Sequence, residues 1–230
     1  MISHKIGPLS LAQKIKILGS FPFFSKLKDR EIEELAKRVR QVLIPQKEIF
    51  VEEDVDFDKA FFVYSGLVSI FRTTRDGELI NLEVIGAPAL VGEMGLVDSK
   101  ESPASVMAIN QTRALVLTQK DFSQIIAQNS QIASLILKLF ADKIRYFDIF
   151  LEELLSKNLY QRTWRLIQYL GKHFPNGEIK LSQEELADLI WGSRSRITEV
   201  LNKLESEGKI KIGHRRVKLL YSLSEHPAKN

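Results

Sequence analysis

The segment SRSRITEVLNKLE, which begins at Ser193, joins a basic front to an apolar stripe. The apolar residues are spaced as on one face of a helix, and they are Ile197, Val200, Leu201 and Leu204. The other face is polar and charged, with Arg194, Ser195, Arg196, Glu199 and Lys203. Guanidinium and hydroxyl groups are donors for phosphate oxygens and base edges. This face is therefore either a solvated helix surface or a nucleic-acid interface, and the neighbouring elements distinguish the two.

The residues around this segment predict a second helix and a tight turn. Ser182 and Glu185 have the capping-box spacing that starts a helix, which EELADLI continues. WGS, with Gly192, is a turn, and RSRITEVLNKLESEG is a helix that ends at Gly208. Two short helices across such a turn form a helix-turn-helix. The following KIKIGHRRVKLLYS alternates around Gly213 and predicts a two-stranded wing.

The charge of the chain is concentrated in this part. Residues 158–230 hold 13 basic and 8 acidic side chains, a net charge of +5, whereas the first 157 residues have a net charge of −1. A basic region beside a neutral one indicates that only the basic region meets a polyanion.

Composition bounds the class of protein. The chain of 230 residues is 44% hydrophobic and 27% charged, which suits one large domain or two modest ones. No window approaches the roughly 18 apolar residues of a membrane span, and the start has no secretory signal. Cysteine is absent, which excludes disulfides and thiolate chemistry and fits a reducing cytoplasm. We therefore expect a cytoplasmic protein without a membrane partner.

The N-terminal part predicts a helix followed by many strands. DREIEELAKRV is amphipathic, with Ile32, Leu35 and Val39 on one side. From Gln41 to about Leu117 the chain consists of short β-rich runs separated by Gly, Asp and Pro turns. This pattern predicts a sandwich or barrel of antiparallel strands.

A long helical run follows, without Gly or Pro, over residues 120–158. A near-heptad series within it could pack on its own domain or on a partner helix, and consists of Ile132, Ile136, Leu139, Lys143, Tyr146, Phe150 and Glu153. The length and the aromatic residues favour a dimer seam, although Lys143 and Glu153 are not apolar. We therefore expect a homodimer.

The order of these elements resembles the Crp/Fnr superfamily of bacterial transcription regulators over nearly the whole chain. The motifs that carry the resemblance are FVYSGLVSIF, VGEMGL and LSQEELADLIWGSRSRITEVLNKLESEGKI. It implies an α+β fold, with an N-terminal antiparallel β-roll, jelly-roll-like, flanking helices, a long dimerisation helix and a C-terminal winged helix-turn-helix. We expect a cyclic-nucleotide-binding-like effector β-roll over residues 1–128, the dimerisation helix over 129–157 and the DNA-binding domain over 158–230.

In this family the helix that starts at SR enters the major groove of double-stranded DNA with its N-terminal residues at the base edges. The resemblance implies that Arg194 contacts guanine O6 and N7, a contact worth ~1–3 kcal/mol of discrimination. Ser195, Thr198 and Glu199 lie on the same face. Glu199 stands where many relatives carry Arg, and a carboxylate accepts from a cytosine amine, so we expect a different DNA site. The phosphate candidates, for which solubility is an alternative explanation, are Gln183, Ser193, Arg196, Lys203, Arg215 and Arg216.

In the cyclic-AMP-binding members, a Gly-Glu pair in the roll holds the ribose and an Arg in the next segment pairs with the cyclic phosphate. Gly92 and Glu93 match the pair. Ser102, followed by Pro103, occupies the position where those members carry the Arg. A buried phosphate without a cation costs free energy. Lys100 lies on the nearby loop, and its flexible ammonium does not replace the rigid, bidentate guanidinium of an Arg.

The long helix departs from those members as well, because Phe147 and Asp148 stand where they place Thr and Ser against adenine. The two departures predict an effector other than cyclic AMP. The candidate effector-binding residues, for which core or seam packing is the alternative, are Phe71, Arg72, Gly92, Glu93, Met94, Ser102, Tyr146 and Phe147.

Other sensing chemistries lack their ligands. An iron–sulfur cluster needs cysteine. Haem is not expected, because the histidines lie outside the roll and none pairs at metal-binding spacing; they are His4, His173, His214 and His226. What remains is an unknown small molecule, apolar or mixed, an unusual anion, or no effector.

The sequence thus predicts a homodimeric, sequence-specific DNA-binding regulator, with RNA polymerase as a further partner, whose roll gates its affinity. A ligand would favour one arrangement of the two long helices and of a hinge near Asn158. The alternatives are a ligand-independent regulator with a purely structural roll, and a cyclic-AMP-responsive one with an atypical phosphate contact. An enzyme is not expected, because the chain has no phosphate-binding Gly loop, metal cluster or activated nucleophile.

Overall fold

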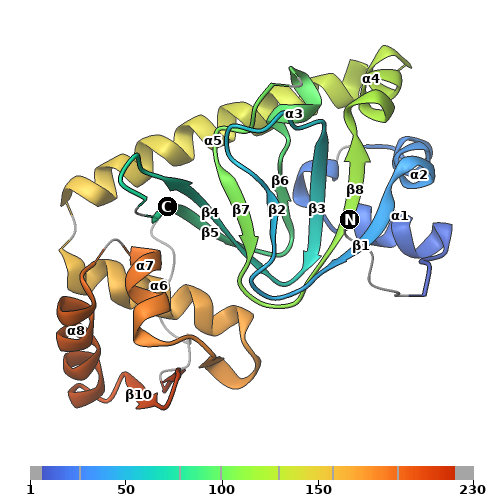
Figure 1. Ribbon diagram of the computed structural model, residues 1–230. Helices are drawn as coiled ribbons and strands as arrows, with labels where there is room; N and C mark the ends of the chain where they lie inside the picture. Colours follow the sequence, from blue (N-terminus) through green and yellow to red (C-terminus); the bar gives the residue numbers. More distant parts are fainter. Residues whose placement is uncertain are drawn as a thin grey trace. The chain divides into compact units, whose positions relative to one another are not determined.

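The computed structural model describes residues 7–25, 27–77, 79–98, 100–128, 130–156, 158–190 and 192–220. The chain forms two compact units, Met1–Glu152 and Glu153–Asn230 (Figure 1). The boundary between them falls inside one long helix, α5 (Ser130–Ser156). None of the helices within these ranges is long and apolar enough to cross a membrane.

The first unit is built on two four-stranded antiparallel sheets that enclose an apolar core. One sheet has the order β1 (Arg40–Ile44), β8 (Thr112–Thr118), β3 (Lys59–Ser65) and β6 (Ala89–Val91). The other has the order β2 (Ile49–Val51), β7 (Ser105–Ala108), β4 (Leu67–Thr73) and β5 (Leu79–Gly86). The fully buried residues between the sheets include Ile44, Val63, Val68, Ala108 and Ala114. The predicted antiparallel β-roll is confirmed.

Helices cover one side of this roll. They are α1 (Leu11–Gly19), the short 3-10 helix η1 (Pro22–Phe24), α2 (Asp29–Arg38), α3 (Met94–Val97) and α4 (Gln119–Gln128). Their apolar faces form a second core with side chains of β3 and β8, in which Leu18, Ala36, Ala60 and Leu115 are fully buried. The flanking helices that the sequence predicts are therefore part of the roll's packing.

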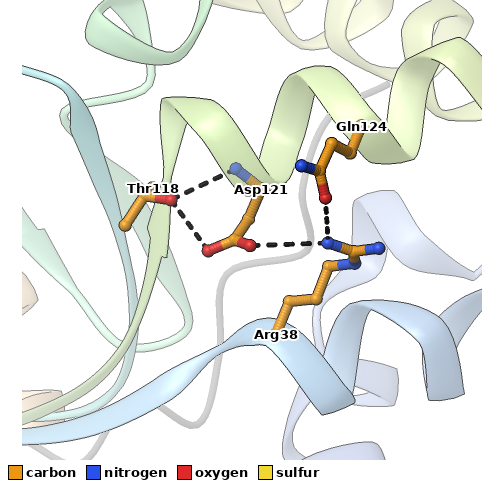
Figure 2. A network of polar contacts seen from close by, with 4 residues as sticks. All are labelled: Arg38, Thr118, Asp121 and Gln124. Atoms are coloured by element: carbon orange, nitrogen blue, oxygen red, sulfur yellow. Dashed lines mark hydrogen bonds and ion pairs between the residues drawn. The ribbon is translucent and has the colours of Figure 1, made fainter.

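A polar network joins α2 to α4, two helices that are far apart in the sequence (Figure 2). Arg38 Nη1 lies 2.5 Å from Gln124 Oε1 and 3.5 Å from Asp121 Oδ1. The Thr118 hydroxyl donates to Asp121 Oδ2 at 2.8 Å and accepts from its backbone N–H at 3.2 Å, which fixes the start of α4. The network holds the helix that leads into α5 against the N-terminal helices.

The first half of the near-heptad series on α5 packs on its own unit. Ile132 is buried in the helix-covered core, and Ile136 and Leu139 pack against that core. Three residues of the near-heptad series therefore pack on their own unit, and Lys143 forms an ion pair there, which is the alternative that the sequence left open beside the dimer seam. The side chains of the other seam residues, Tyr146, Phe150 and Glu153, lie outside the described part of the structure.

The second unit packs three helices on a small sheet. Its elements are α6 (Leu159–His173), η2 (Pro175–Gly177), β9 (Glu178–Ile179), α7 (Gln183–Ile190), α8 (Arg194–Ser206), β10 (Ile210–Gly213) and β11 (Arg216–Leu219). The strands pair antiparallel in the order β10-β11-β9, so β9 adds a third strand to the two predicted. The core includes Ile167, Leu170, Leu186, Ile197 and Leu201, all with no exposed area. The predicted winged helix-turn-helix is confirmed.

Candidate functional site

The N-terminal end of α8 stands exposed while its other face is buried. Ser193 caps the helix, because its hydroxyl accepts the backbone N–H of Arg196 at 3.5 Å. Residues 193–196 are all exposed, whereas Ile197 one position later is fully buried. Glu199 is exposed on the next turn. Two guanidinium groups and a carboxylate therefore project from a rigidly packed helix end, a geometry suited to reading base edges.

A hydrogen bond joins this helix to α7. The Thr198 hydroxyl lies 2.8 Å from Gln183 Oε1 and 2.9 Å from the carbonyl oxygen of Arg194. Gln183 is thus placed beside the exposed end of α8 at the start of α7. Because its oxygen faces Thr198, its amide NH2 is the group that can donate to a phosphate.

The start of α7 is fixed by the predicted capping box. The backbone N–H of Ser182 donates to Glu185 Oε2 at 2.8 Å, and the backbone N–H of Glu185 donates to the Ser182 hydroxyl at 3.1 Å. The same helix carries Asp188, whose pKa is raised by partial burial of the carboxyl and then by the charges of Glu184 and Glu185. The carboxylates of α7 therefore repel one another.

The remaining predicted phosphate contacts each have an intramolecular neighbour. Lys203 Nζ lies 5.1 Å from the centre of the Tyr160 ring. Arg216 Nη1 lies 2.7 Å from Glu178 Oε1, and Arg215 Nη2 lies 3.9 Å from Glu185 Oε2. Both arginine side chains are at least 60% exposed. Because exposed ion pairs contribute little, a phosphate can compete for these groups.

A cavity of about 550 Å³ lies within the first unit, between the roll, α3 and α5. Six of the eight predicted effector residues line it, and they are Arg72, Gly92, Glu93, Met94, Ser102 and Phe147. Phe71 does not line it, because strand alternation turns Ile70 and Arg72 to the cavity and Phe71 to a buried position on the opposite face. The Tyr146 side chain is outside the described residues.

Gly92 is required by backbone geometry at the cavity wall. Its φ is +75°, and a Cβ there would lie 2.8 Å from the Lys59 carbonyl oxygen and from a ring carbon of Phe57. Only glycine fits such a position without a rearrangement. It sets the backbone that presents the next residue, Glu93, to the cavity.

Glu93 is paired with a cation from α5. Lys143 Nζ lies 2.5 Å from Glu93 Oε1, and the two side chains are 38% and 7% exposed respectively. The helical spacing places Lys143 in the near-heptad series and does not reveal its contact at the cavity. The signal that could have found it is a lysine that interrupts the apolar residues in the middle of the series, between Leu139 and Tyr146.

The second cation of the cavity is also paired. Arg72 Nε lies 2.5 Å from Glu53 Oε1, and the Thr73 backbone N–H donates to Glu53 Oε2 at 2.9 Å. Burial alone would raise the pKa of Glu53, but these two hydrogen bonds outweigh it and lower that pKa. Ser102 is engaged within its own loop, since its hydroxyl donates to the Ala104 carbonyl oxygen at 2.8 Å.

Neither of the two histidines in the described residues lines the cavity. His173 Nδ1 lies 2.9 Å from the Tyr169 carbonyl oxygen at the end of α6, and His214 is exposed in the wing turn. His4 and His226 lie outside the described residues.

A β-roll with a cavity, followed by a winged helix-turn-helix, is the architecture of a transcription regulator. Residues 41–129 match the cyclic nucleotide-binding domain, and residues 161–221 match the Crp-like helix-turn-helix domain. The cyclic AMP receptor protein of Thermus thermophilus is 31% identical over 84% of this chain and 89% of its own length. The chain therefore belongs to the Crp/Fnr family of transcription regulators.

Further relatives support the same family and fold. A CRP-like cAMP-activated global transcriptional regulator of Mycobacterium tuberculosis is 25% identical over 86% of this chain and 91% of its own length. The crystal structure of the Thermus thermophilus catabolite activator protein has a TM-score of 0.53, is 27% identical and covers 86% of this chain and 93% of its own. That of the c-di-GMP responsive regulator CLP from Xanthomonas campestris has a TM-score of 0.65 at 22% identity, covering 85% of this chain and 100% of its own, which supports the fold alone.

Proposed function

We propose that this chain is a homodimeric, sequence-specific DNA-binding regulator, gated by a small-molecule effector in the roll that is not cyclic AMP. The observation that carries the DNA-binding function is the N-terminal end of α8, which is exposed while the opposite face of the same helix is buried in the core of its unit. Arg194 and Glu199 are the proposed base readers, with Ser195 and Thr198 beside them. The proposed phosphate contacts are Gln183, Ser193, Arg196, Lys203, Arg215 and Arg216.

The proposed dimer contact is an exposed apolar stripe on α5. Leu137, Ile144 and Leu151 follow one another at intervals of seven residues and are 72%, 65% and 41% exposed. Phe147, 56% exposed, lies one turn from Ile144. A seven-residue apolar repeat is the pattern of helices that pack on a second helix. The same stripe on a second copy of the chain is self-complementary under two-fold symmetry.

Gating follows from the two roles of α5. This helix carries Lys143 at the cavity and the apolar stripe on another face. A ligand that changes the Lys143 contact therefore favours one position of α5, and thus one arrangement of the dimer. We propose that this shift brings the two copies of α8 into register with the DNA, with the hinge near Asn158.

The charges of the cavity support an effector other than cyclic AMP. Both cations among the described lining residues, Arg72 and Lys143, are already paired with carboxylates. A cyclic phosphate would have to displace one of them, and displacing Glu93 leaves a carboxylate that is 7% exposed without a cation. Leaving a buried charge unpaired costs several kcal/mol.

A second candidate is a cyclic-AMP-responsive regulator in which Lys143 is the atypical phosphate contact. The position of Lys143 in the cavity and the cyclic AMP receptor among the relatives favour this alternative. A titration of thermal stability with cyclic AMP, and with cyclic GMP as its companion, separates the two. We expect no shift in melting temperature, and a saturable rise would support the second candidate. A ligand-independent regulator would show no shift with any small molecule.

Selection of binding sites from randomised duplex DNA tests the DNA-reading function. We expect a near-palindromic site whose two halves lie about one helical turn, roughly 34 Å, apart. Recovery of no consensus sequence would contradict the proposal. We further propose that the DNA-bound dimer contacts RNA polymerase and that the protein acts in the cytoplasm, which its cysteine-free composition supports.

A further inference from the structure

We infer that the cavity takes a ligand of zero net charge, with an ammonium and a carboxylate at one end and an apolar body at the other. This inference rests on the proposed effector role of the cavity and names the chemical class of its ligand. The inference is argued from the ion pair between Glu93 and Lys143.

The greater part of the cavity wall is apolar. Its two sides are supplied by the sheets and by α5, with Val51, Phe57, Ile70, Ile85, Val106 and Phe147 among the lining residues. Such a wall binds the apolar body of a ligand, while a few polar groups fix its orientation. The polar group that links the roll to α5 is the ion pair between Glu93 and Lys143.

The two partners of this pair differ in exposure. The Glu93 side chain is 7% exposed and is held by the backbone turn at Gly92, whereas the Lys143 side chain is 38% exposed. Lys143 therefore has room to swing towards solvent, and Glu93 does not. A ligand enters between them by moving Lys143.

Charge balance then selects the ligand. A simple anion would pair with Lys143 and leave the buried Glu93 carboxylate without a cation, and a simple cation would do the reverse. A ligand with adjacent ammonium and carboxylate groups satisfies both, because its ammonium pairs with Glu93 and its carboxylate pairs with Lys143. No charge is left unpaired by the exchange.

The other cation of the described lining is also paired. Arg72 is bound by Glu53, and the lining carboxylate Asp142 Oδ1 lies 2.8 Å from Arg145 Nη1. An anionic ligand therefore meets no cation in the described lining that lacks a carboxylate partner, whereas a net-neutral ligand can exchange with the Glu93–Lys143 pair.

Thermal-shift titrations with three compounds of similar size test this inference. L-phenylalanine carries both charges, 3-phenylpropionate carries only the carboxylate, and 2-phenylethylamine carries only the ammonium. We expect a saturable rise in melting temperature with L-phenylalanine, or with another apolar α-amino acid of a panel containing leucine, methionine and tryptophan. Neither single-charge compound should produce it at the same concentration.

Matched variants connect the response to the ion pair. The double variant Glu93→Gln/Lys143→Met removes both charges together, so that no buried charge is left unpaired, and we expect it to fold and lose the response. Lys138→Met, an exposed lysine on the same helix, should keep it. A full response in the double variant would overturn the assignment of the binding groups.

The outcomes also separate this inference from the proposed function. If 3-phenylpropionate binds as well as L-phenylalanine, or if no amino acid of the panel binds at millimolar concentration, the ligand class is wrong. The proposed regulator remains in either case, provided that site selection still yields a consensus DNA sequence. If selection yields none while the amino acid binds, the proposed function fails and the ligand class stands.

Discussion

Arg194 and Lys203 lie on the same helix but in different surroundings. Arg194 is exposed at the helix end, whereas Lys203 lies nine residues later, over the Tyr160 ring. A base contact discriminates between sequences, while a phosphate contact does not. The two side chains therefore make different contributions to the proposed DNA complex.

Arg194→Ala should relax the base preference at one position of each half-site, at a cost of ~1–3 kcal/mol for the preferred base. Lys203→Ala should weaken binding to all sequences alike and reduce the salt slope by about one. Fluorescence anisotropy with single-base-substituted duplexes at several salt concentrations measures both effects. An unchanged base preference in Arg194→Ala would contradict the assignment of this residue.

Individual residues also show where sequence reasoning succeeds and where it ends. The cavity positions of Gly92, Glu93 and Ser102 could be predicted, because all three lie in one short stretch of sequence that can be matched to the family without knowing the tertiary packing. The Lys143 contact joins residues 50 positions apart. It depends on how α5 packs on the roll, which no local pattern reveals.

At the scale of elements, the long helix has two apolar stripes. One contains Ile132, Ile136 and Leu139 and packs on the roll, and the other contains Leu137 and Ile144 and is exposed. Both satisfy near-heptad spacing, so periodicity predicts that α5 is a helix with an interface but does not say which stripe its own unit covers. The helix-turn-helix was predictable in more detail, because caps and turns mark its ends locally.

Ile144→Glu should dissociate the proposed dimer. The substitution places two carboxylates near the two-fold axis and removes apolar area, which costs roughly 2 kcal/mol or more, about thirtyfold in the dissociation constant. Sedimentation equilibrium measures it. Arg145→Glu, at the adjacent and 70% exposed position, is the matched control and should remain dimeric. A dimer of unchanged affinity in Ile144→Glu would place the interface elsewhere.

Helix α7 allows a test of electrostatics. The pKa of Asp188 is raised by partial burial and by Glu184 and Glu185, so the charged carboxylate destabilises the folded state at neutral pH. The penalty disappears as the pH falls below the ordinary Asp range, where both states are protonated. Asp188→Asn should therefore stabilise the protein at pH 7 by about 0.2–0.5 kcal/mol, a small gain because the residue as a whole is exposed and solvent screens a carboxylate that is only partly desolvated.

Urea unfolding at pH 7 and near pH 3 measures this effect, and the gain should vanish at the lower pH. Asp76→Asn, at an exposed position in the turn between β4 and β5, is the control and should change stability at neither pH. A destabilised Asp188→Asn variant at pH 7 would show that the carboxylate makes a favourable contact instead.

At the scale of the whole molecule, the chain consists of two compact units whose boundary falls inside one helix, α5. The roll holds a cavity with an ion pair to α5, and the second unit holds an exposed helix end. Neither unit needs the other for its own core, since each has its own buried cluster. We therefore expect the proposed effector to act through the proposed dimer and not through the folding of either unit.

The most direct test of the central claim measures affinity for the selected palindrome as the spacing of its halves is changed. Two recognition helices related by two-fold symmetry must meet half-sites on the same side of the duplex, about 10 base pairs apart. We expect tight binding to the selected duplex and a loss to near non-specific affinity when five base pairs are inserted between the halves. Equal affinity for both duplexes would contradict a dimer that reads two half-sites.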